Sequence, residues 1–144
     1  MQPKKIYVAS SWRNEYQPAV VEMLRNEGHE VYDFRNLEYA FKWSDIDEDW
    51  LNWTPEVFRK KLSHQLAFKG YNQDFGGMKW ADTCVLLLPS GRSAHIEAGT
   101  MIGWNKRCII YLKPEKFEPE LMYKEVPTSD IVINDTELLT RLRI

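Results

Sequence analysis

One carboxylate lies near the start of a predicted helix, directly after a predicted buried strand, where an enzyme with an open parallel sheet would bind its substrate. Glu97 lies in the segment Leu88–Gly99, which follows the apolar run Cys84–Leu88 and leads into a helical stretch. In such sheets, ligands bind at the carboxyl ends of strands, where helix N-termini meet them. A carboxylate placed there can attack an anomeric carbon and hold a sugar covalently, dividing one difficult displacement into two easier steps. The structural alternative is an acid near a helix start, which the helix dipole stabilises.

Two further residues are candidates for catalysis beside Glu97. Tyr7, near the end of the first predicted strand, could meet Glu97 at the neighbouring strand, orient it and reduce its basicity. The alternative for Tyr7 is a core aromatic with a satisfied hydroxyl. Asp74 precedes a short predicted helix, where it is either a helix N-cap or a general acid or base toward a leaving group.

Hydroxyl and guanidinium groups follow two of the predicted strands. Ser11 and Arg13 come after the first strand, and Arg92 and Ser93 come after the strand at 83–88. Such groups beside a strand end can hold a phosphate or a carboxylate, although solvated surface arginines are an alternative. The sequence contains neither GxGxxG nor GxxxxGK[ST], so neither a Rossmann fingerprint nor a P-loop is indicated.

The acidic run near residue 50 has the spacing of a calcium loop but not its glycine. Asp45, Asp47, Asp49 and Glu56 occupy positions 1, 3, 5 and 12 of an EF-hand count, and Trp50 stands where the tight turn requires glycine. The three histidines have no zinc-ligand spacing. We therefore expect no metal site and no cofactor.

The bulk composition is that of one compact globular domain over residues 1–144. Hydrophobic residues make up 44% of the chain and charged residues 28%, and the net charge of −2 does not favour a nucleic-acid polymer as partner. The N-terminal apolar stretch is too short for a signal peptide or a membrane span, which predicts a cytoplasmic protein with no membrane contact. Cys84 and Cys108 are expected to be buried free thiols, with a disulfide or a metal pair left open.

Helical and strand patterns alternate along the chain. Strands are predicted at 5–10, 30–34, 83–88, 107–112 and 131–133, and helices at 14–26 (capped by Asn14), 55–68, 74–81, 94–105 and 135–142. This order predicts a single-domain α/β fold: a flavodoxin-like, doubly wound, five-stranded parallel sheet with helices on both faces. Residues 35–54 are predicted to form a long aromatic and acidic loop, whose tryptophans either stack on a substrate base or pack as core.

Short motifs at several points of the chain have the order and spacing of a known enzyme family. They are Lys5-Ile6-Tyr7 followed by Trp12, Tyr71-Asn72-Gln73-Asp74 with Gly77, Lys79 and Asp82, Glu97-Ala98-Gly99, and Glu120-Leu121-Met122. Over most of its length the chain thereby resembles the nucleoside 2-deoxyribosyltransferase superfamily, which includes the related 2′-deoxynucleoside 5′-phosphate N-hydrolases.

The resemblance implies cleavage of an N-glycosidic bond in a nucleoside or nucleotide. Glu97 would attack C1′ with retention and form a glycosyl-enzyme ester, Asp74 would serve the departing base, and Tyr7 would tune Glu97. Trp12 and Asn72 belong to the matched motifs and are assigned to substrate binding. Transfer to a second base makes the enzyme a transferase, and transfer to water makes it a hydrolase.

The resemblance also implies an assembly. Met122 would contact substrate in the active site of a neighbouring subunit, so a homodimer or a larger homo-oligomer is expected. The partner of the chain is otherwise a small nucleoside or nucleotide.

Two positions depart from the transferase pattern. The transferases carry an acid six residues before the nucleophile, where it binds the 5′-hydroxyl, and Gly91 stands there in this chain. Two residues before the nucleophile, where the family is often glycine-rich, the chain has His95. Both positions are assigned to substrate binding.

The residues around these departures favour a phosphorylated substrate. Ser11 and Arg13 match the Ser and Arg with which the related N-hydrolases bind phosphate, and Arg92 and Ser93 add a second cation and hydroxyl. A strict 2′-deoxynucleoside 5′-monophosphate N-hydrolase is therefore the first alternative to a transferase. A nucleotide sensor that has kept the pocket and lost the chemistry is the second.

Overall fold

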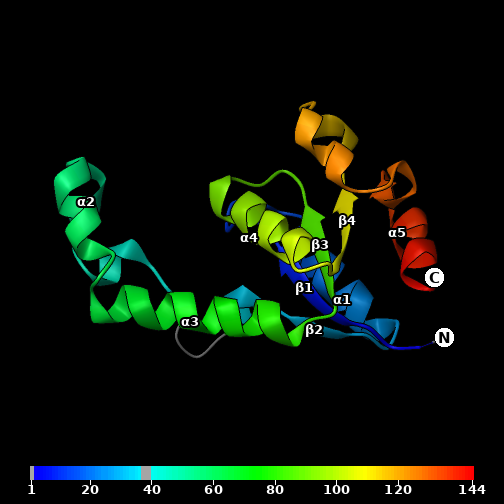
Figure 1. Ribbon diagram of the computed structural model, residues 1–144, viewed down its shortest axis with the longest axis horizontal. Helices are drawn as coiled ribbons and strands as arrows, with labels where there is room; N and C mark the ends of the chain where they lie inside the picture. The colour runs from blue at the N-terminus through cyan, green and yellow to red at the C-terminus, as the bar shows by residue number, and fades with distance from the viewer. Residues whose placement is uncertain (1, 37–39) are drawn as a thin grey trace. The chain divides into compact units, whose positions relative to one another are not determined.

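The computed structural model describes residues 2–36 and 40–144 (Figure 1). The chain divides into two compact units, of which the second is Phe34–Gly77 and the first comprises the residues before and after it. Across the described ranges, no helix has both the length and the apolar character needed to cross a membrane.

The first unit is built on a parallel sheet. Its strands are β1 (Lys5–Ala9), β2 (Glu30–Tyr32), β3 (Thr83–Leu87), β4 (Arg107–Tyr111) and β5 (Ile131–Val132). All neighbouring pairs are parallel, and the spatial order is β2-β1-β3-β4-β5. This is the flavodoxin-like strand order, so the predicted five-stranded α/β fold is confirmed.

Alternate residues of each strand face opposite layers of helices, as a pleated strand requires. Ile6 and Val8 of β1 belong to a core cluster with residues of α1 (Gln17–Asn26) and α5 (Asp135–Leu142). Tyr7, between them, faces α4 (Arg92–Gly103), which packs on β1, β3 and β4. Because β3 and β4 are covered on both faces, their residues are almost all apolar and buried.

The two cysteines lie side by side in this sheet. Cys84 of β3 is paired in register with Cys108 of β4, and both are buried and free. A hydrogen bond to Cys108, together with burial, raises the pKa of the Cys84 thiol well above its usual value. The expectation of buried free thiols is confirmed.

Helix α1 begins later than the sequence predicts, so the assignment of Asn14 as its cap is wrong. The helix starts at Gln17, with Tyr16 as N-cap and a proline in its first turn. The Asn14 side chain accepts a hydrogen bond from the Tyr16 backbone N–H at 2.8 Å, in a turn that precedes the helix.

The helices predicted at 55–68 and 74–81 are divided differently in the structure. Thr54 caps α2 (Pro55–Lys61), a turn follows, and α3 (Gln65–Trp80) then runs without a break through the second predicted helix. His64 Nδ1 accepts the backbone N–H of Leu66 at 3.0 Å at the start of α3. Asp74 therefore lies inside a helix, so the alternative that it is a helix N-cap is wrong.

The described part of the predicted loop at 35–54 contains the short 3-10 helices η1 (Phe34–Asn36), η2 (Trp43–Asp45) and η3 (Trp50–Asn52). Residues 37–39 of that loop lie outside the described residues. Trp43 packs edge-on against Trp53 and Phe58, with ring centroids 5.6 and 5.7 Å apart. The Trp53 indole donates to Asp47 at 2.8 Å. Trp43 and Trp53 of this segment thus form a small aromatic cluster with Phe58 of α2 within the second unit.

Two glycines of α3 provide a matched test of packing in the second unit. A Cβ on Gly70 would lie 2.8 Å from Phe41 Cβ, whereas a Cβ on Gly76 would have no atom within 4 Å. We expect Gly70→Ala to lower the free energy of unfolding by about 1–3 kcal/mol through overpacking. Gly76→Ala should raise it by about 0.5–1 kcal/mol through helix propensity. Urea unfolding followed by tryptophan fluorescence measures both, and equal effects would contradict the described packing.

Candidate active site

Glu97 lies in the second turn of α4, on the side that meets β1. Ala94 and Ala98 are buried against the sheet, and their small side chains allow α4 to approach it closely. Glu97 itself is half-buried. The hydroxyl of Tyr7 donates a hydrogen bond to Glu97 Oε2 at 2.5 Å. The structure therefore brings together the two residues that the sequence pairs across 90 positions.

Tyr7 is held rigidly in the position from which it reaches Glu97. Its side chain is 1% exposed, and its ring stacks on Tyr32 of β2 with centroids 5.1 Å apart and planes 9° from parallel. A buried and stacked phenol has little freedom to move, so the hydrogen bond fixes the direction of the Glu97 carboxylate. A fixed carboxylate is what attack on a single carbon atom requires.

This arrangement predicts the effect of removing one hydroxyl. We expect Tyr7→Phe to keep the stacked ring and the fold, and to lower kcat by about 10–100-fold while KM changes little, because only the orientation of Glu97 is lost. Steady-state kinetics of base release measures the two constants. Tyr32→Phe is the control, since it keeps the stacking ring; a kcat equal to wild type in Tyr7→Phe would contradict the assigned role.

The predicted anion-binding residues follow two neighbouring strands at one edge of the sheet, on the loop after β1 and at the start of α4. Ser11, Trp12 and Arg13 follow β1, and the segment Gly91–Ser93 follows β3. Because Ala9 of β1 pairs with Leu86 of β3, both loops leave the sheet at the same edge. Trp12 is 49% exposed, and the side chains of Arg13, Arg92 and Ser93 are also exposed.

Helix α4 starts at this edge without a side-chain cap. Its N-cap is Gly91, so no side chain accepts a hydrogen bond from the first N–H groups of the helix. Such a helix start favours an anion, since unpaired N–H groups and the positive end of the helix dipole coincide there. In the first unit, Arg13 therefore lies on the loop after β1, and Arg92 is the first residue of α4, at the helix N-terminus that follows the neighbouring strand β3.

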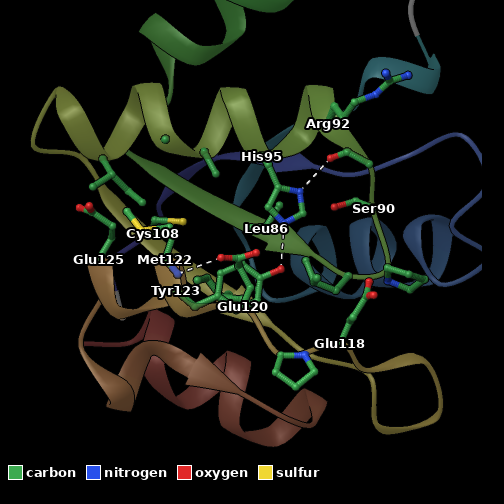
Figure 2. A pocket seen from close by; sticks show the side chains of 18 of the residues that line it. Leu86, Ser90, Arg92, His95, Cys108, Glu118, Glu120, Met122, Tyr123 and Glu125 are labelled. Atoms are coloured by element: carbon green, nitrogen blue, oxygen red, sulfur yellow. Dashed lines mark hydrogen bonds between the residues drawn. The ribbon is translucent and has the colours of Figure 1, made fainter.

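A wide pocket of about 1080 Å³ lies on the other side of α4 (Figure 2). It is lined by His95, Gly99 and Ile102 of α4 and by the segment around η5 (Leu121–Glu125), including Met122. Residues 95 and 97 of one helix are about 200° apart around its axis. Within this chain, His95 and Met122 therefore lie together in the pocket, away from Glu97.

His95 joins the first turn of α4 to η5. Its Nδ1 lies 2.8 Å from the carbonyl oxygen of Gly91, and its Nε2 lies 2.8 Å from the Tyr123 hydroxyl (Figure 2). Burial and the carboxylates of Glu120 and Glu118 raise the pKa of Tyr123 to about 12, so this hydroxyl stays protonated. Since a carbonyl only accepts, the neutral ring carries its proton on Nδ1 and accepts at Nε2 from Tyr123.

Asn72 and Asp74 belong to the second unit. Both lie on α3, Asn72 exposed and Asp74 half-buried. In the described ranges, no group of three or more histidine, cysteine, aspartate or glutamate side chains could hold a metal ion.

Sequence reasoning overlooked Tyr123 and gave Asn14 a different role. Tyr123 directly follows the Glu120-Leu121-Met122 motif, so its place beside the motif was the available signal. Asn14 is 1% exposed. Its burial could not be predicted, because an asparagine just before a helix is also the usual residue of an exposed helix cap.

Comparisons with known proteins find solved structures with a similar fold. No protein-family model matches the chain, and no curated protein does so. A solved structure of a 2-deoxyribosyltransferase from Bacillus psychrosaccharolyticus is similar, with 21% identity, 84% of this chain and 81% of that chain covered, and a TM-score of 0.53. The CMP N-glycosidase BcmB of Clostridium botulinum is also similar, with 17% identity, coverage of 97% and 98%, and a TM-score of 0.54.

At these identities, the likeness concerns the backbone. It runs through nearly the whole chain and includes both units. The chain therefore has the fold of a 2-deoxyribosyltransferase and of a CMP N-glycosidase, and the resemblance drawn from its motifs is confirmed at the level of the fold.

Proposed function

We propose that this protein cleaves the N-glycosidic bond of a nucleoside or deoxynucleoside, or of its 5′-monophosphate, with Glu97 as the nucleophile. The observation that carries the proposal is the 2.5 Å hydrogen bond from the buried Tyr7 to Glu97. A carboxylate whose direction is fixed by a rigid donor, on a helix that starts at the carboxyl edge of a parallel sheet, suits attack on a bound sugar. The names of the two similar structures support this chemistry.

The reaction has two displacement steps. In the first, a Glu97 carboxylate oxygen forms a bond to C1′, the bond between C1′ and the base nitrogen breaks, and the base leaves with the electron pair and takes up a proton. In the second, water or the nitrogen of another base attacks C1′, loses a proton and releases the Glu97 carboxylate. Two inversions give net retention at C1′.

Asp74 is assigned to the departing base, as its proton donor or its anchor. The support is the resemblance of the segment Tyr71–Asp82 to the transferases. We expect Asp74→Asn to reduce base release by about 10²–10³-fold, because the leaving nitrogen loses its acid. Glu56→Gln, which removes an exposed carboxylate of α2 in the same unit, is the matched control. Equal rates of base release in Asp74→Asn and wild type would contradict the assignment of Asp74 to the departing base.

The substrate is proposed to carry a 5′-phosphate. Gly91 replaces the acid that would bind a 5′-hydroxyl, and it leaves the start of α4 without a side-chain cap. Arg13 lies on the loop after β1, and Arg92 is the first residue of α4, at the same edge of the sheet. Paired guanidinium groups and helix N–H groups are the donors that phosphate prefers in proteins. The name of one similar structure contains a nucleoside monophosphate, CMP.

The active form is proposed to be a homodimer or a larger homo-oligomer. Met122 is 60% exposed, and it lines the pocket on the side of α4 that faces away from Glu97. It therefore cannot serve the Glu97 of its own chain from that position, which supports a role for Met122 in the site of a neighbouring subunit.

One chromatographic assay tests the proposed reaction. The protein is incubated with deoxynucleosides and with deoxynucleoside 5′-monophosphates, each with and without a second free base. An exchanged nucleoside or nucleotide identifies a transferase, and free base with sugar phosphate identifies an N-hydrolase. Thermal stabilisation by a nucleotide without any base release at high protein concentration would instead identify a sensor, and would overturn the proposal.

A further inference from the structure

Asn14 makes an unusual number of hydrogen bonds for a loop residue. Its carboxamide Nδ2 donates to Ser10 Oγ at 3.0 Å, to the Leu87 carbonyl at 3.2 Å and to the Pro89 carbonyl at 3.1 Å. Its Oδ1 accepts the backbone N–H of Tyr16 at 2.8 Å, and its own N–H donates to the Ser11 carbonyl at 3.0 Å. The residue is 1% exposed, so water does not compete for these bonds.

These bonds join the two loops that carry the proposed phosphate ligands. Asn14 directly follows Arg13 in the loop after β1, and its carbonyl partners Leu87 and Pro89 lie at the end of β3 and in the loop that leads to Arg92. Ser10 strengthens the same link, since its hydroxyl donates to the Leu87 carbonyl at 3.2 Å. The spacing between the loops is therefore fixed by a small buried polar cluster, which we name the loop clamp: Ser10, Asn14, Leu87 and Pro89.

An amide is the side chain that this place requires. It provides two N–H donors for carbonyl oxygens and one acceptor for a backbone N–H. Aspartate has the same shape, but it would set a carboxylate against the Leu87 and Pro89 carbonyl oxygens and remove the N–H donor that Asn14 provides to them. Alanine or leucine would remove the Asn14 donor from both carbonyls and leave Ser10 as the side-chain donor to Leu87, which is unfavourable for buried carbonyl groups.

We infer that Asn14 is a positioning residue for the phosphate of the substrate: by joining the loop that carries Arg13 to the segment that leads to Arg92, it lets both guanidinium groups meet one phosphate. This inference rests on the proposed function. It predicts that loosening the clamp weakens binding at the 5′ end of the substrate and leaves the contacts of sugar and base with Tyr7 and Glu97 in place.

The test compares two ligands that differ only in the phosphate. Calorimetry measures the affinity of a deoxynucleoside 5′-monophosphate and of the same deoxynucleoside for protein carrying Glu97→Gln, which prevents turnover. We expect Asn14→Ala to weaken nucleotide binding by about tenfold or more, since correct spacing of both arginines is lost, and nucleoside binding by less than about twofold. Asn14→Asp, which adds a negative charge, should weaken nucleotide binding further.

Two additional variants separate positioning from stability. Asn134 caps α5 by accepting the Glu137 N–H at 2.8 Å, so Asn134→Ala removes a stabilising asparagine away from the loop clamp. It should leave both affinities unchanged. Ser10→Ala removes only one donor of the loop clamp and replaces Asn14→Ala in the test if that variant does not fold. It should weaken nucleotide binding selectively, but by less than Asn14→Ala. Equal weakening of both ligands, or no weakening of either, would overturn the inference.

Orthophosphate distinguishes failure of this inference from failure of the proposed function. If wild-type protein releases base but the Asn14 variants keep their preference for the nucleotide, only the role of Asn14 is wrong. If wild-type protein releases no base, the proposed reaction is wrong, and orthophosphate affinity in wild type and Asn14→Ala still tests the clamp. Orthophosphate binding that is absent in wild type or equal in both would overturn it.

Discussion

Glu97→Ala is expected to abolish base release, with a fall in kcat of at least about 10³-fold. The reason is that the variant has no carboxylate to attack C1′, so the covalent route is closed and only direct displacement by water remains. The fold should survive, because Glu97 is half-buried at the edge of the α4–sheet contact and alanine is compatible with a helix. Single-turnover assays with chromatographic detection of the base measure the loss.

A carboxylate elsewhere provides the control for this variant. Glu22 is exposed on α1, and Glu22→Gln removes one negative charge without touching Tyr7 or Glu97. It should turn over at the wild-type rate. Turnover by Glu97→Ala within about threefold of wild type would show that this carboxylate is structural, as an acid near a helix start can be.

Asp130→Asn is expected to cause the largest loss of stability, about 2–4 kcal/mol. Asp130 is 5% exposed and receives hydrogen bonds at 2.9 Å from Arg107 at the start of β4 and from Arg141 in α5. The variant leaves two partly buried guanidinium groups without their counter-charge. Urea unfolding measures the loss. Glu27→Gln, which breaks the exposed ion pair with Arg143, is the control and should cost less than about 1 kcal/mol.

The same ion triad gives the stability a defined pH dependence. Burial opposes ionisation of Asp130, but the hydrogen bonds and charges of Arg107 and Arg141 outweigh it, so its pKa lies below the ordinary value of 3.8. A depressed carboxyl pKa contributes stability above that ordinary value, and the contribution is lost as the pH falls through the folded-state pKa. The difference between wild type and Asp130→Asn should therefore be full at pH 7 and smaller near pH 3; an increase at low pH would contradict it.

The sheet could be predicted because its strands are buried on both faces. A strand such as Thr83–Leu87 is a continuous apolar run, and alternation with helices determines that the sheet is parallel. The division of α2 and α3 could not be predicted in the same way. Gly70 falls in the predicted gap between the helices at 55–68 and 74–81, yet α3 passes through it, and the lack of a Cβ there leaves room for the nearby Phe41 side chain.

The site was predictable where it depends on strand parity and on helical spacing. Tyr7 alternates with Ile6 and Val8, so its side chain must face the layer opposite to theirs, where Glu97 lies. The loop clamp and the contact of His95 with Tyr123 were not predictable. They depend on how two loops and one short helix pack after the sheet has formed, and no spacing in the sequence records that packing.

The most direct test of the account is the identification of the glycosyl-enzyme ester. Trypsin cleaves after Arg92 and Lys106 and releases the peptide 93–106, in which Glu97 is the only carboxylate side chain. The reaction is quenched with acid during turnover of a deoxynucleoside or its 5′-monophosphate. Mass spectrometry should then find this peptide heavier by the mass of a deoxyribosyl group or of a 5-phosphodeoxyribosyl group. The added mass should be absent in Glu97→Gln. Steady base release without an adduct on this peptide, or with an adduct on another peptide, would contradict the assignment of Glu97 as the nucleophile.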